Sequence, residues 1–331
     1  ALLPTYPFQR RRFWRPAKPS SLHAEIHTAH PLLGRKVSLA GVQNEIRYES
    51  SVEPDSPPWM SDHEVMGRVV APGAAYLEMA LAAADSRAVE NLTFESPLQL
   101  DGRTRLQAAV RRDDEGRDAI EIFAAPASRD QWTRHVSATF AERAAHAPDA
   151  RELEALQEAC PERAPTDEFY RALADMGLHY GGAFQTIEEL HVGSEGVLTR
   201  LATRGDIRGF TVPPPLLDGA LHSLAVGLLR EDDGNLFLPA RVGRIECFQP
   251  VTDACWCHAR WRATEGATRV ADLTLLDDEG RVAIVIDGLE VQAINRSALR
   301  RMSGAGPDRL LHEIRWQAFR LPAPTSAPKN Y

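Results

Sequence analysis

The stretch HEVMGRVVAPGAAYLEMALAAA holds the first side chains of this chain that could do chemistry. Its first residue, His63, can exchange a proton near neutral pH. Gly67 allows the chain to turn, and Pro72 suits the start of a helix, where the first N–H groups have no partner inside the helix. Those N–H groups, around Gly73, can bind negative charge that develops on an acyl oxygen. A lone histidine is ordinarily structural, but this context predicts a base beside an oxyanion-binding site.

A second group lies in LLDGALHSLAVGLL, at residues 216–229. Asp218 and His222 are four residues apart, so a helix would place them on one face. The neighbours of Asp218 are leucine, glycine and alanine, which predicts a buried carboxyl instead of a solvated one. Burial without a partner raises the pKa of a carboxyl. A carboxyl that stays protonated near neutrality can act as a general acid, and His222 is within reach to hold it.

The elements that must position these residues occur in the same order in each half of the chain. A helix is expected after Pro72 to about Ala84 and another after Pro215 to about Leu229, each followed by four strand-like runs. The runs lie near residues 91–94, 105–110, 119–124 and 133–140, and near 241–248, 255–263, 270–276 and 282–291. The first helix is apolar nearly all round, so it must be buried on most sides. The pattern predicts an α+β fold in which a sheet wraps around each helix.

Composition excludes several classes of function. The net charge of −8 offers no basic surface for nucleic acid. No segment has the run of roughly 18 apolar residues that a membrane span needs, and the first residues lack the order of a signal peptide, so we expect a soluble protein. Cys255 and Cys257 alternate along an expected strand without the spacing of zinc ligands. We expect the four cysteines to be reduced thiols in a cytoplasmic setting.

Changes in composition predict the domain boundaries. Residues 1–20 are rich in proline, arginine and aromatic residues, and we expect them to form an extended segment. The first half of the fold is expected at 21–145 and the second at 166–298, separated by a proline-rich and charged linker at 146–165. Residues 299–331 are expected to be a C-terminal linker toward a downstream domain.

Four motifs together resemble the dehydratase domains of modular type I polyketide synthases. HEVMGRVVAP matches the family pattern HxxxGxxxxP, and DGALH matches DxxxQ/H. HYGGAF at 179–184 is similar to YGPxF, and HPLLG at 30–34 is similar to the opening strand motif. LPTYPFQRRRFW resembles the linker after an acyltransferase domain, and LHEIRWQ resembles the start of a downstream reductase region. The resemblance therefore spans essentially the whole chain.

The resemblance implies a double-hotdog fold with one active site between the two hotdogs. His63 would remove an α-proton from a β-hydroxyacyl thioester, and Asp218 would protonate the departing hydroxyl. His222 and Tyr180 would support them, and the Gly73 N–H would bind the thioester carbonyl. Gly67 and Pro72 would complete the site as motif residues.

The family also implies partners. The substrate would arrive on the phosphopantetheine arm of an acyl carrier protein, with no cofactor or metal bound by the dehydratase. Neighbouring polyketide synthase domains and a second copy in a homodimer would be the other partners. Arg296, Arg300 and Arg301 are candidates for docking the acidic carrier protein, and a solvated charge cluster is the alternative interpretation.

Two positions depart from the family pattern. Gly182 stands where the family usually has proline, which predicts a looser loop around Tyr180. LPARVGR at 238–244 keeps the Leu-Pro of the family's LPFxW but lacks its tryptophan, which predicts a wider pocket wall.

Other functions remain open at this stage. A double-bond isomerase or cyclase would use the same pair of residues with a different substrate pose. A catalytically silent structural domain of a multienzyme would keep the fold without activity. A hotdog thioesterase would need a carboxylate that positions water, and no motif for one is present.

Overall fold

The computed structural model describes residues 30–295, apart from 38–39, 43, 113–115, 195, 206–207, 230–234 and 263–267. The expected terminal segments 1–20 and 299–331 therefore lie outside the described residues, as do Arg296, Arg300 and Arg301. Among the residues described, no helix is both long enough and apolar enough to cross a bilayer.

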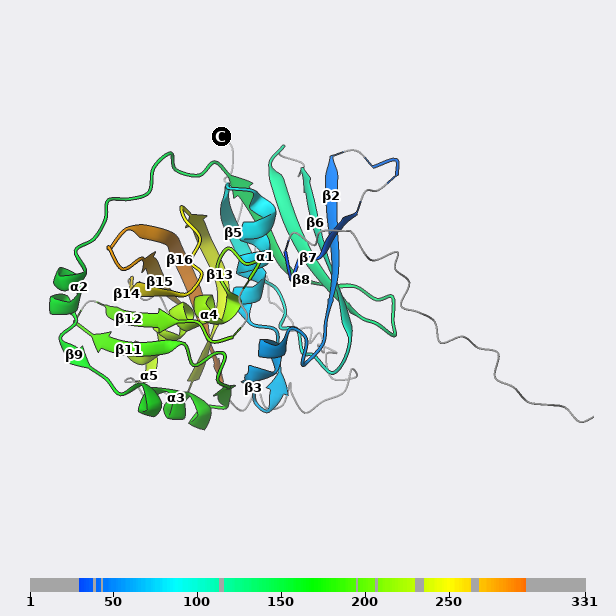
Figure 1. Cartoon of the computed structure of the whole chain (residues 1–331). Coiled ribbons are helices and arrows are strands. Elements are labelled where there is room, and N and C mark those ends of the chain that lie inside the picture. The colour runs from blue at the N-terminus through cyan, green and yellow to red at the C-terminus, as the bar shows by residue number, and fades with distance from the viewer. Residues whose placement is uncertain are drawn as a thin grey trace, which may run out of the picture.

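The first half is a sheet curved around one helix, as expected (Figure 1). The helix α1 spans Gly73–Ala84, and ten of its twelve residues are buried, in keeping with its lack of a polar face. The strands are β1 (Arg35–Val37), β2 (Glu45–Val52), β5 (Ala88–Phe94), β6 (Thr104–Arg112), β7 (Asp118–Pro126) and β8 (Thr133–Ala141). Their order in the sheet is β1-β2-β6-β7-β8-β5.

The motif HPLLG differs from the expected opening strand. His30 and Gly34 form an isolated bridge across a turn, and β1 begins only after it. Gly34 has a φ of 70°, and a Cβ there would lie 2.2 Å from the backbone oxygen of Glu49. The turn therefore requires glycine at position 34, and the HPLLG motif forms this turn instead of a strand.

The second half repeats the arrangement around α4 (Pro214–His222) and α5 (Ala225–Leu229). Its strands are β9 (Glu162–Arg163), β11 (Ile187–Val192), β12 (Val197–Ala202), β13 (Asn235–Cys247), β14 (Ala254–Trp261), β15 (Thr268–Leu276) and β16 (Val282–Asn295). Two further helices, α2 (Leu153–Ala159) and α3 (Thr166–Asp175), precede β9 and β11 respectively.

The expectation of one continuous helix to about Leu229 was wrong. The helix is interrupted at Ser223. The Ser223 hydroxyl donates to the Gly219 carbonyl at 3.2 Å and lies 2.8 Å from the Thr199 hydroxyl of β12. The N–H of Leu224 then bonds the Leu221 carbonyl, three residues back instead of four. A serine that competes for backbone groups in this way bends or ends a helix.

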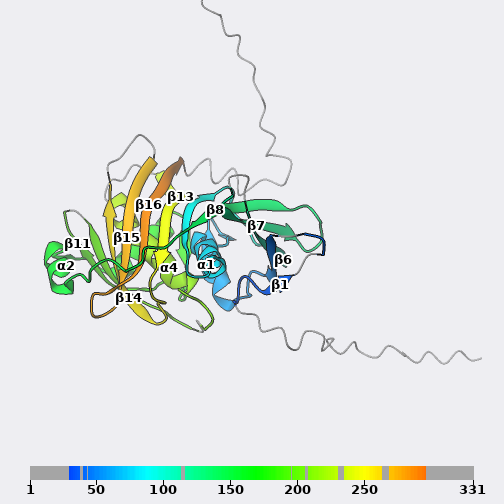
Figure 2. The same cartoon turned by 90° about the horizontal axis from the view of Figure 1, so that it is seen from above.

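Over the described residues, the two sheets join into one sheet of 13 strands, because β5 pairs antiparallel with β13. Seen from above, α1 and α4 lie side by side beneath the junction (Figure 2). A helix within each of two joined hotdog sheets is the double-hotdog arrangement that the family resemblance implied.

A small sheet of three strands connects the halves beside the two helices. It consists of β4 (Arg68–Val69), β3 (His63–Val65) and β10 (Leu178–Tyr180) in the order β10-β3-β4. The pairing sets His63 directly opposite Tyr180. A short 3-10 helix, η2 (Pro58–Asp62), leads into β3. Two of the predicted site residues thus come together through backbone pairing between halves.

Candidate active site

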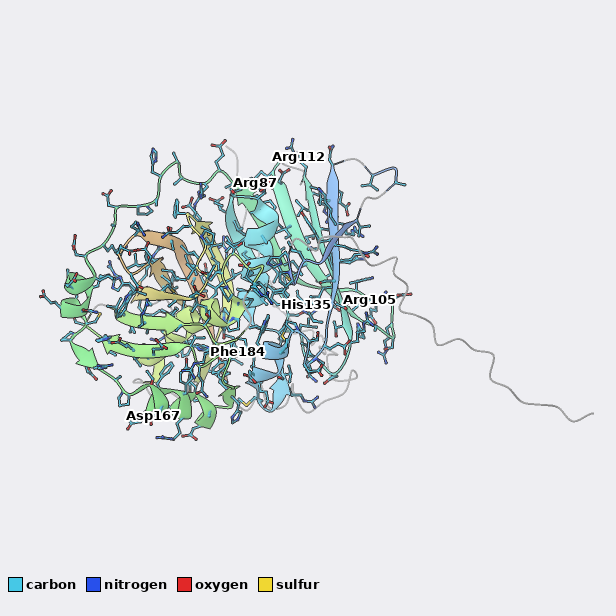
Figure 3. All side chains as sticks on the ribbon, viewed as in Figure 1. Arg87, Arg105, Arg112, His135, Asp167 and Phe184 are labelled. Atoms are coloured by element: carbon cyan, nitrogen blue, oxygen red, sulfur yellow. The ribbon has the colours of Figure 1, made fainter. Side chains whose placement is uncertain are left out.

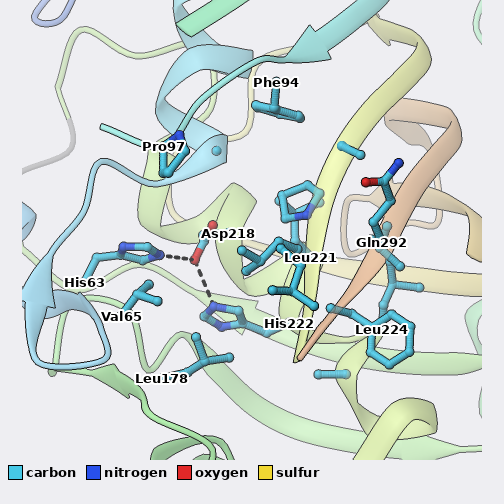
Figure 4. Close-up of a pocket in the computed structure, with 18 of the residues that line it drawn as sticks. His63, Val65, Phe94, Pro97, Leu178, Asp218, Leu221, His222, Leu224 and Gln292 are labelled. Atoms are coloured by element: carbon cyan, nitrogen blue, oxygen red, sulfur yellow. Dashed lines mark ion pairs between the residues drawn. The ribbon is translucent and has the colours of Figure 1, made fainter. Parts of the chain in front are cut away.

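His63 and Asp218 meet in one cavity between the two halves (Figure 4). His63 is the first residue of β3, and Asp218 lies in α4, yet His63 Nε2 is 3.7 Å from Asp218 Oδ2. The cavity has a volume of about 330 Å³. All of the predicted site residues except Gly67 and Pro72 line it. The chain therefore brings together side chains that are far apart in the sequence.

The tautomer of His63 follows from its backbone contact. His63 Nδ1 lies 2.7 Å from the Val70 carbonyl oxygen, and a carbonyl can only accept, so Nδ1 carries the proton. Nε2 is then the free nitrogen that faces Asp218. Burial lowers the pKa of His63, against the opposing charge of Asp218, and keeps the imidazole neutral near pH 7. His63 can accept a proton at Nε2.

The turn that returns the chain to Val70 explains Gly67. Met66 and Gly67 connect β3 to β4, and both have positive φ, at 52° and 74°. No atom lies within 4 Å of a Cβ built on Gly67, so glycine serves the turn conformation and not a close approach.

Asp218 is buried, as expected, but its pKa does not rise. Desolvation acts to raise the pKa of this carboxyl, but the imidazoles of His222 and His63 outweigh it and lower the pKa below its usual value. The expectation of a raised pKa was wrong because it assumed a carboxyl without close partners. His222 Nε2 lies 2.8 Å from Asp218 Oδ2 and is the nearer of the two imidazoles.

Tyr180 lies against both histidines. Its ring centroid is 4.0 Å from that of His222 and 5.4 Å from that of His63. Burial raises the pKa of the Tyr180 phenol, so it stays protonated and can donate a hydrogen bond.

The loop after Tyr180 is held by Asp62, which sequence reasoning missed. Gly181 donates its N–H to the Asp62 carbonyl at 2.7 Å, and Ala183 donates to Asp62 Oδ2 at 2.8 Å. A Cβ on Gly181 would lie 2.4 Å from the Asp62 carboxyl, so glycine is required there. The looser loop predicted from Gly182 is therefore countered by two bonds to the residue that precedes His63. The position of Asp62 directly before His63 was the sequence signal that could have identified it.

The start of α1 faces the cavity. Pro72 caps the helix with extended backbone angles, and Gly73 is its first residue and lines the cavity. A Cβ on Gly73 would lie 3.4 Å from Phe94 and 3.5 Å from Pro239, both of which also line the cavity. The helix start therefore offers N–H groups and a partial positive charge in the same cavity as His63 and Asp218.

The wall near the Leu-Pro motif is formed by Leu238, Pro239 and Ala240. Val242, which stands where the family motif has tryptophan, is fully buried in the core and is not among the residues that line the cavity. The wider pocket wall expected from the missing tryptophan stays a prediction.

A buried glutamate links the halves behind the site and was also missed. Glu78 of α1 accepts hydrogen bonds from His30 Nε2 at 3.0 Å, from the Thr211 N–H at 2.6 Å and from the Val212 N–H at 3.0 Å. His30 Nδ1 accepts from the N–H groups after it, so Nε2 is the nitrogen that donates. We call His30, Glu78, Thr211 and Val212 the Glu78 cluster. A glutamate inside an otherwise apolar helix was the sequence signal for it.

The cysteines lie apart from the site. All four are free thiols, and burial raises the pKa of Cys255 and Cys257. Within the described part of the chain, no group of three or more His, Cys, Asp or Glu side chains could hold a metal ion.

Sequence comparisons relate this chain to known proteins. Residues 30–125 match the family described as "Polyketide synthase dehydratase domain", and residues 148–301 match "Polyketide synthase dehydratase N-terminal domain". Erythronolide synthase EryA2 from Saccharopolyspora erythraea is 29% identical over 98% of this chain. The chain spans only 9% of the length of that synthase.

Solved structures give the same result for the fold. The dehydratase domain from the CurF module of curacin polyketide synthase is 26% identical, with a TM-score of 0.74 over 81% of this chain and 100% of that one. Two variants of the CurK dehydratase, one His-to-Phe and one Asp-to-Asn, are described as inactive mutants. Both are 25% identical over 80% of this chain and 99% of theirs, with TM-scores of 0.74 and 0.73. Both halves of the chain match dehydratase models and the whole fold matches dehydratase domains, so this chain belongs to the polyketide synthase dehydratase family.

Proposed function

We propose that this domain is a hydro-lyase that removes water from a β-hydroxyacyl thioester, with His63 as the base and Asp218 as the acid. One observation carries the proposal: the free Nε2 of a neutral, buried His63 lies 3.7 Å from the Asp218 carboxyl, in a cavity that also receives the start of α1. Family membership supports the same reaction.

In the first part of the reaction, His63 Nε2 takes the α-proton of the thioester. The electron pair of the broken C–H bond moves toward the carbonyl, whose oxygen gains negative charge. The N–H groups at the start of α1, at Gly73, stabilise that charge. Such donors contribute most when they point to where the charge develops.

In the second part, the electron pair forms the α,β double bond and the bond from the β-carbon to oxygen breaks. Asp218 gives its proton to the departing hydroxyl, which leaves as water. Because the imidazoles lower the pKa of Asp218, only a small fraction of this carboxyl holds a proton at neutral pH, and that protonated fraction is a readier proton donor. Tyr180, which remains protonated, and His222 orient the hydroxyl and the carboxyl.

The same pair resets the site. After elimination, His63 carries one extra proton and Asp218 lacks one. The 3.7 Å separation between Nε2 and Oδ2 is longer than a hydrogen bond, so the proton returns after a small movement of the side chains or through solvent once product leaves. The pair thus shares one transferable proton through each cycle.

The inactive CurK variants support this assignment by analogy. In that relative, replacement of one histidine and of one aspartate is described as giving inactive enzymes. In the present chain one aspartate, Asp218, faces two histidines in the cavity, and His63 is the one that begins the HxxxGxxxxP motif.

The proposal includes the partners that the family implies. The substrate would be carried on the phosphopantetheine arm of an acyl carrier protein, without a cofactor bound by the domain, and neighbouring synthase domains would deliver and receive it. A homodimer and a cytoplasmic location are part of the same proposal. The domain division at 21–145, 146–165 and 166–298 is also proposed, and α2 and β9 lie within the linker region.

The test is incubation of the domain with each enantiomer of a β-hydroxyacyl carrier protein, followed by mass spectrometry of the acyl arm. Loss of one water mass from one enantiomer is expected. A thioesterase would instead release free acid, and a silent domain would leave both substrates intact. A double-bond isomerase or cyclase would also leave both intact, but would convert an unsaturated thioester without mass change when given one in a second incubation. Any of these three outcomes without water loss would contradict the proposal.

A further inference from the structure

Tyr76 carries a buried hydroxyl that the mechanism above does not use. The residue lies on α1, only 4% of its surface is exposed, and it is one of the residues that line the cavity. Within the described part of the chain, its hydroxyl has no hydrogen-bond partner. Buried hydroxyls in native proteins are nearly always bonded, so an unbonded one on a residue that lines a cavity points to a partner that the protein itself does not supply.

The position of Tyr76 on the helix indicates where its hydroxyl is useful. Gly73 and Tyr76 are three residues apart, so they lie on one face of α1, and both line the cavity. Side chains on a helix lean toward its N-terminus, so the Tyr76 ring covers the first turn. The Tyr76 side chain therefore lies beside the N–H groups proposed to bind the thioester carbonyl.

The packing of the Tyr76 ring holds it in this orientation. The ring lies parallel to that of His135, with a centroid separation of 6.3 Å and an interplanar angle of 7°. His135 is on β8 of the first-half sheet, beside α1 (Figure 3), and its Nδ1 is 2.9 Å from the Ser96 carbonyl. Burial raises the pKa of the Tyr76 phenol, so it keeps its proton and remains a donor. Phenylalanine would pack the same space without leaving a polar group unpaired.

We propose that the Tyr76 hydroxyl donates a hydrogen bond to the carbonyl oxygen of the bound acyl thioester, beside the Gly73 N–H. The proposal rests on the proposed function, because it assigns the substrate group that occupies the start of α1. The same bond strengthens as the carbonyl oxygen gains charge during removal of the α-proton. Tyr76 is thereby a further catalytic residue of this domain.

The experiment is a binding cycle that needs no turnover. S-Butyryl-pantetheine is a thioester without a β-hydroxyl, and S-butyl-pantetheine is the matching thioether without the carbonyl. Calorimetric titration of the parental domain and of Tyr76→Phe with both compounds gives four affinities. We expect Tyr76→Phe to weaken binding of the thioester about fivefold and to leave binding of the thioether unchanged.

A matched control separates this role from a structural one. The Tyr170 hydroxyl is bonded within the protein, to the Phe184 carbonyl at 3.3 Å and the Ile187 N–H at 3.1 Å, and it is not among the residues that line the cavity. Tyr170→Phe should lower the melting temperature, whereas Tyr76→Phe should leave it unchanged or raise it, because it removes an unpaired hydroxyl.

Several results would overturn the proposal. They are equal weakening of both compounds, no weakening of either, a parental domain that does not prefer the thioester, or a melting temperature of Tyr76→Phe as low as that of Tyr170→Phe. Dehydration by the parental domain is measured separately on the β-hydroxyacyl carrier protein. Failure of the proposed function would appear there, and failure of the Tyr76 assignment would appear in the binding cycle.

Discussion

His63 has one free imidazole nitrogen because the other donates to the Val70 carbonyl. Replacement by alanine removes the base while β3 keeps its backbone pairing to β10. We expect His63→Ala to lower the rate of dehydration by about 10² to 10⁴, the usual contribution of a positioned base, with an unchanged circular dichroism spectrum. Near-parental turnover in a steady-state assay would mean that His63 is a structural residue.

Asp218→Asn tests the role of Asp218 as the general acid. The amide keeps the shape of the side chain but cannot give a proton to the departing hydroxyl, so we expect no measurable dehydration. His222→Gln is the matched variant, since glutamine can still bond Asp218 from the position 2.8 Å away, and we expect a much milder loss. If His222→Gln were as inactive as Asp218→Asn, the imidazole itself would take part in proton transfer.

The pH dependence follows from the shared proton. The pair is active when it holds one proton in total, because His63 must be neutral to take the α-proton and Asp218 must have a proton to give. Burial lowers the pKa of His63 from 6.5, and the imidazoles lower that of Asp218 from 3.8, so the pair loses its last proton below pH 6.5 and the basic limb of kcat/KM should have its midpoint there. A midpoint above pH 6.5, measured on the free enzyme with a pantetheine thioester, would contradict a desolvated His63.

At the scale of elements, the Glu78 cluster connects α1 to the loop that begins α4. Its three donors are all N–H groups, so Glu78→Gln would direct its own amide N–H toward one of them. We expect the substitution to lower the free energy of unfolding by about 1 to 3 kcal/mol and to reduce kcat, because the helix that carries Asp218 starts from this loop. Urea unfolding and steady-state kinetics measure the two effects.

Glu188→Gln is the control for that substitution, since Glu188 is an exposed residue of β11. It should leave both stability and kcat close to the parental values. A Glu78→Gln variant that behaved like Glu188→Gln would show that the cluster does not position α4.

At the scale of the whole molecule, the carrier protein must reach the cavity despite the acidic charge of both partners. The net charge of this chain is −8, so attraction requires a local basic patch. Reversal of Arg300 and Arg301 to glutamate should raise the apparent KM for a carrier-bound substrate in a salt-dependent way. A small pantetheine thioester, which needs no docking, should be turned over normally. Equal effects on the two substrates, or none on either, would remove these arginines as a docking patch.

The sequence by itself determined the parts of this protein that depend on local pattern. The spacing from His63 through Pro72 to an apolar helix, and the pair Asp218 and His222 on the next helix, located the candidate site, and the element order indicated a duplicated α+β fold. These signals are readable because helix entry and strand alternation depend on neighbouring residues.

The tertiary structure decided what depends on contacts between distant residues. The direction of the Asp218 pKa was set by two imidazoles, one of them from the other half of the chain, and burial alone predicted the opposite direction. Asp62 and Glu78 gained their roles from loops far along the chain, and the Ser223 break required Thr199 of a neighbouring strand. The contacts of Asp62 and Glu78, and that of His63 with Asp218, form only when the two halves pack together, whereas the Ser223 contact forms when α4 packs on its own sheet. Electrostatic and hydrogen-bonding effects act over a few ångströms in space and not along the sequence.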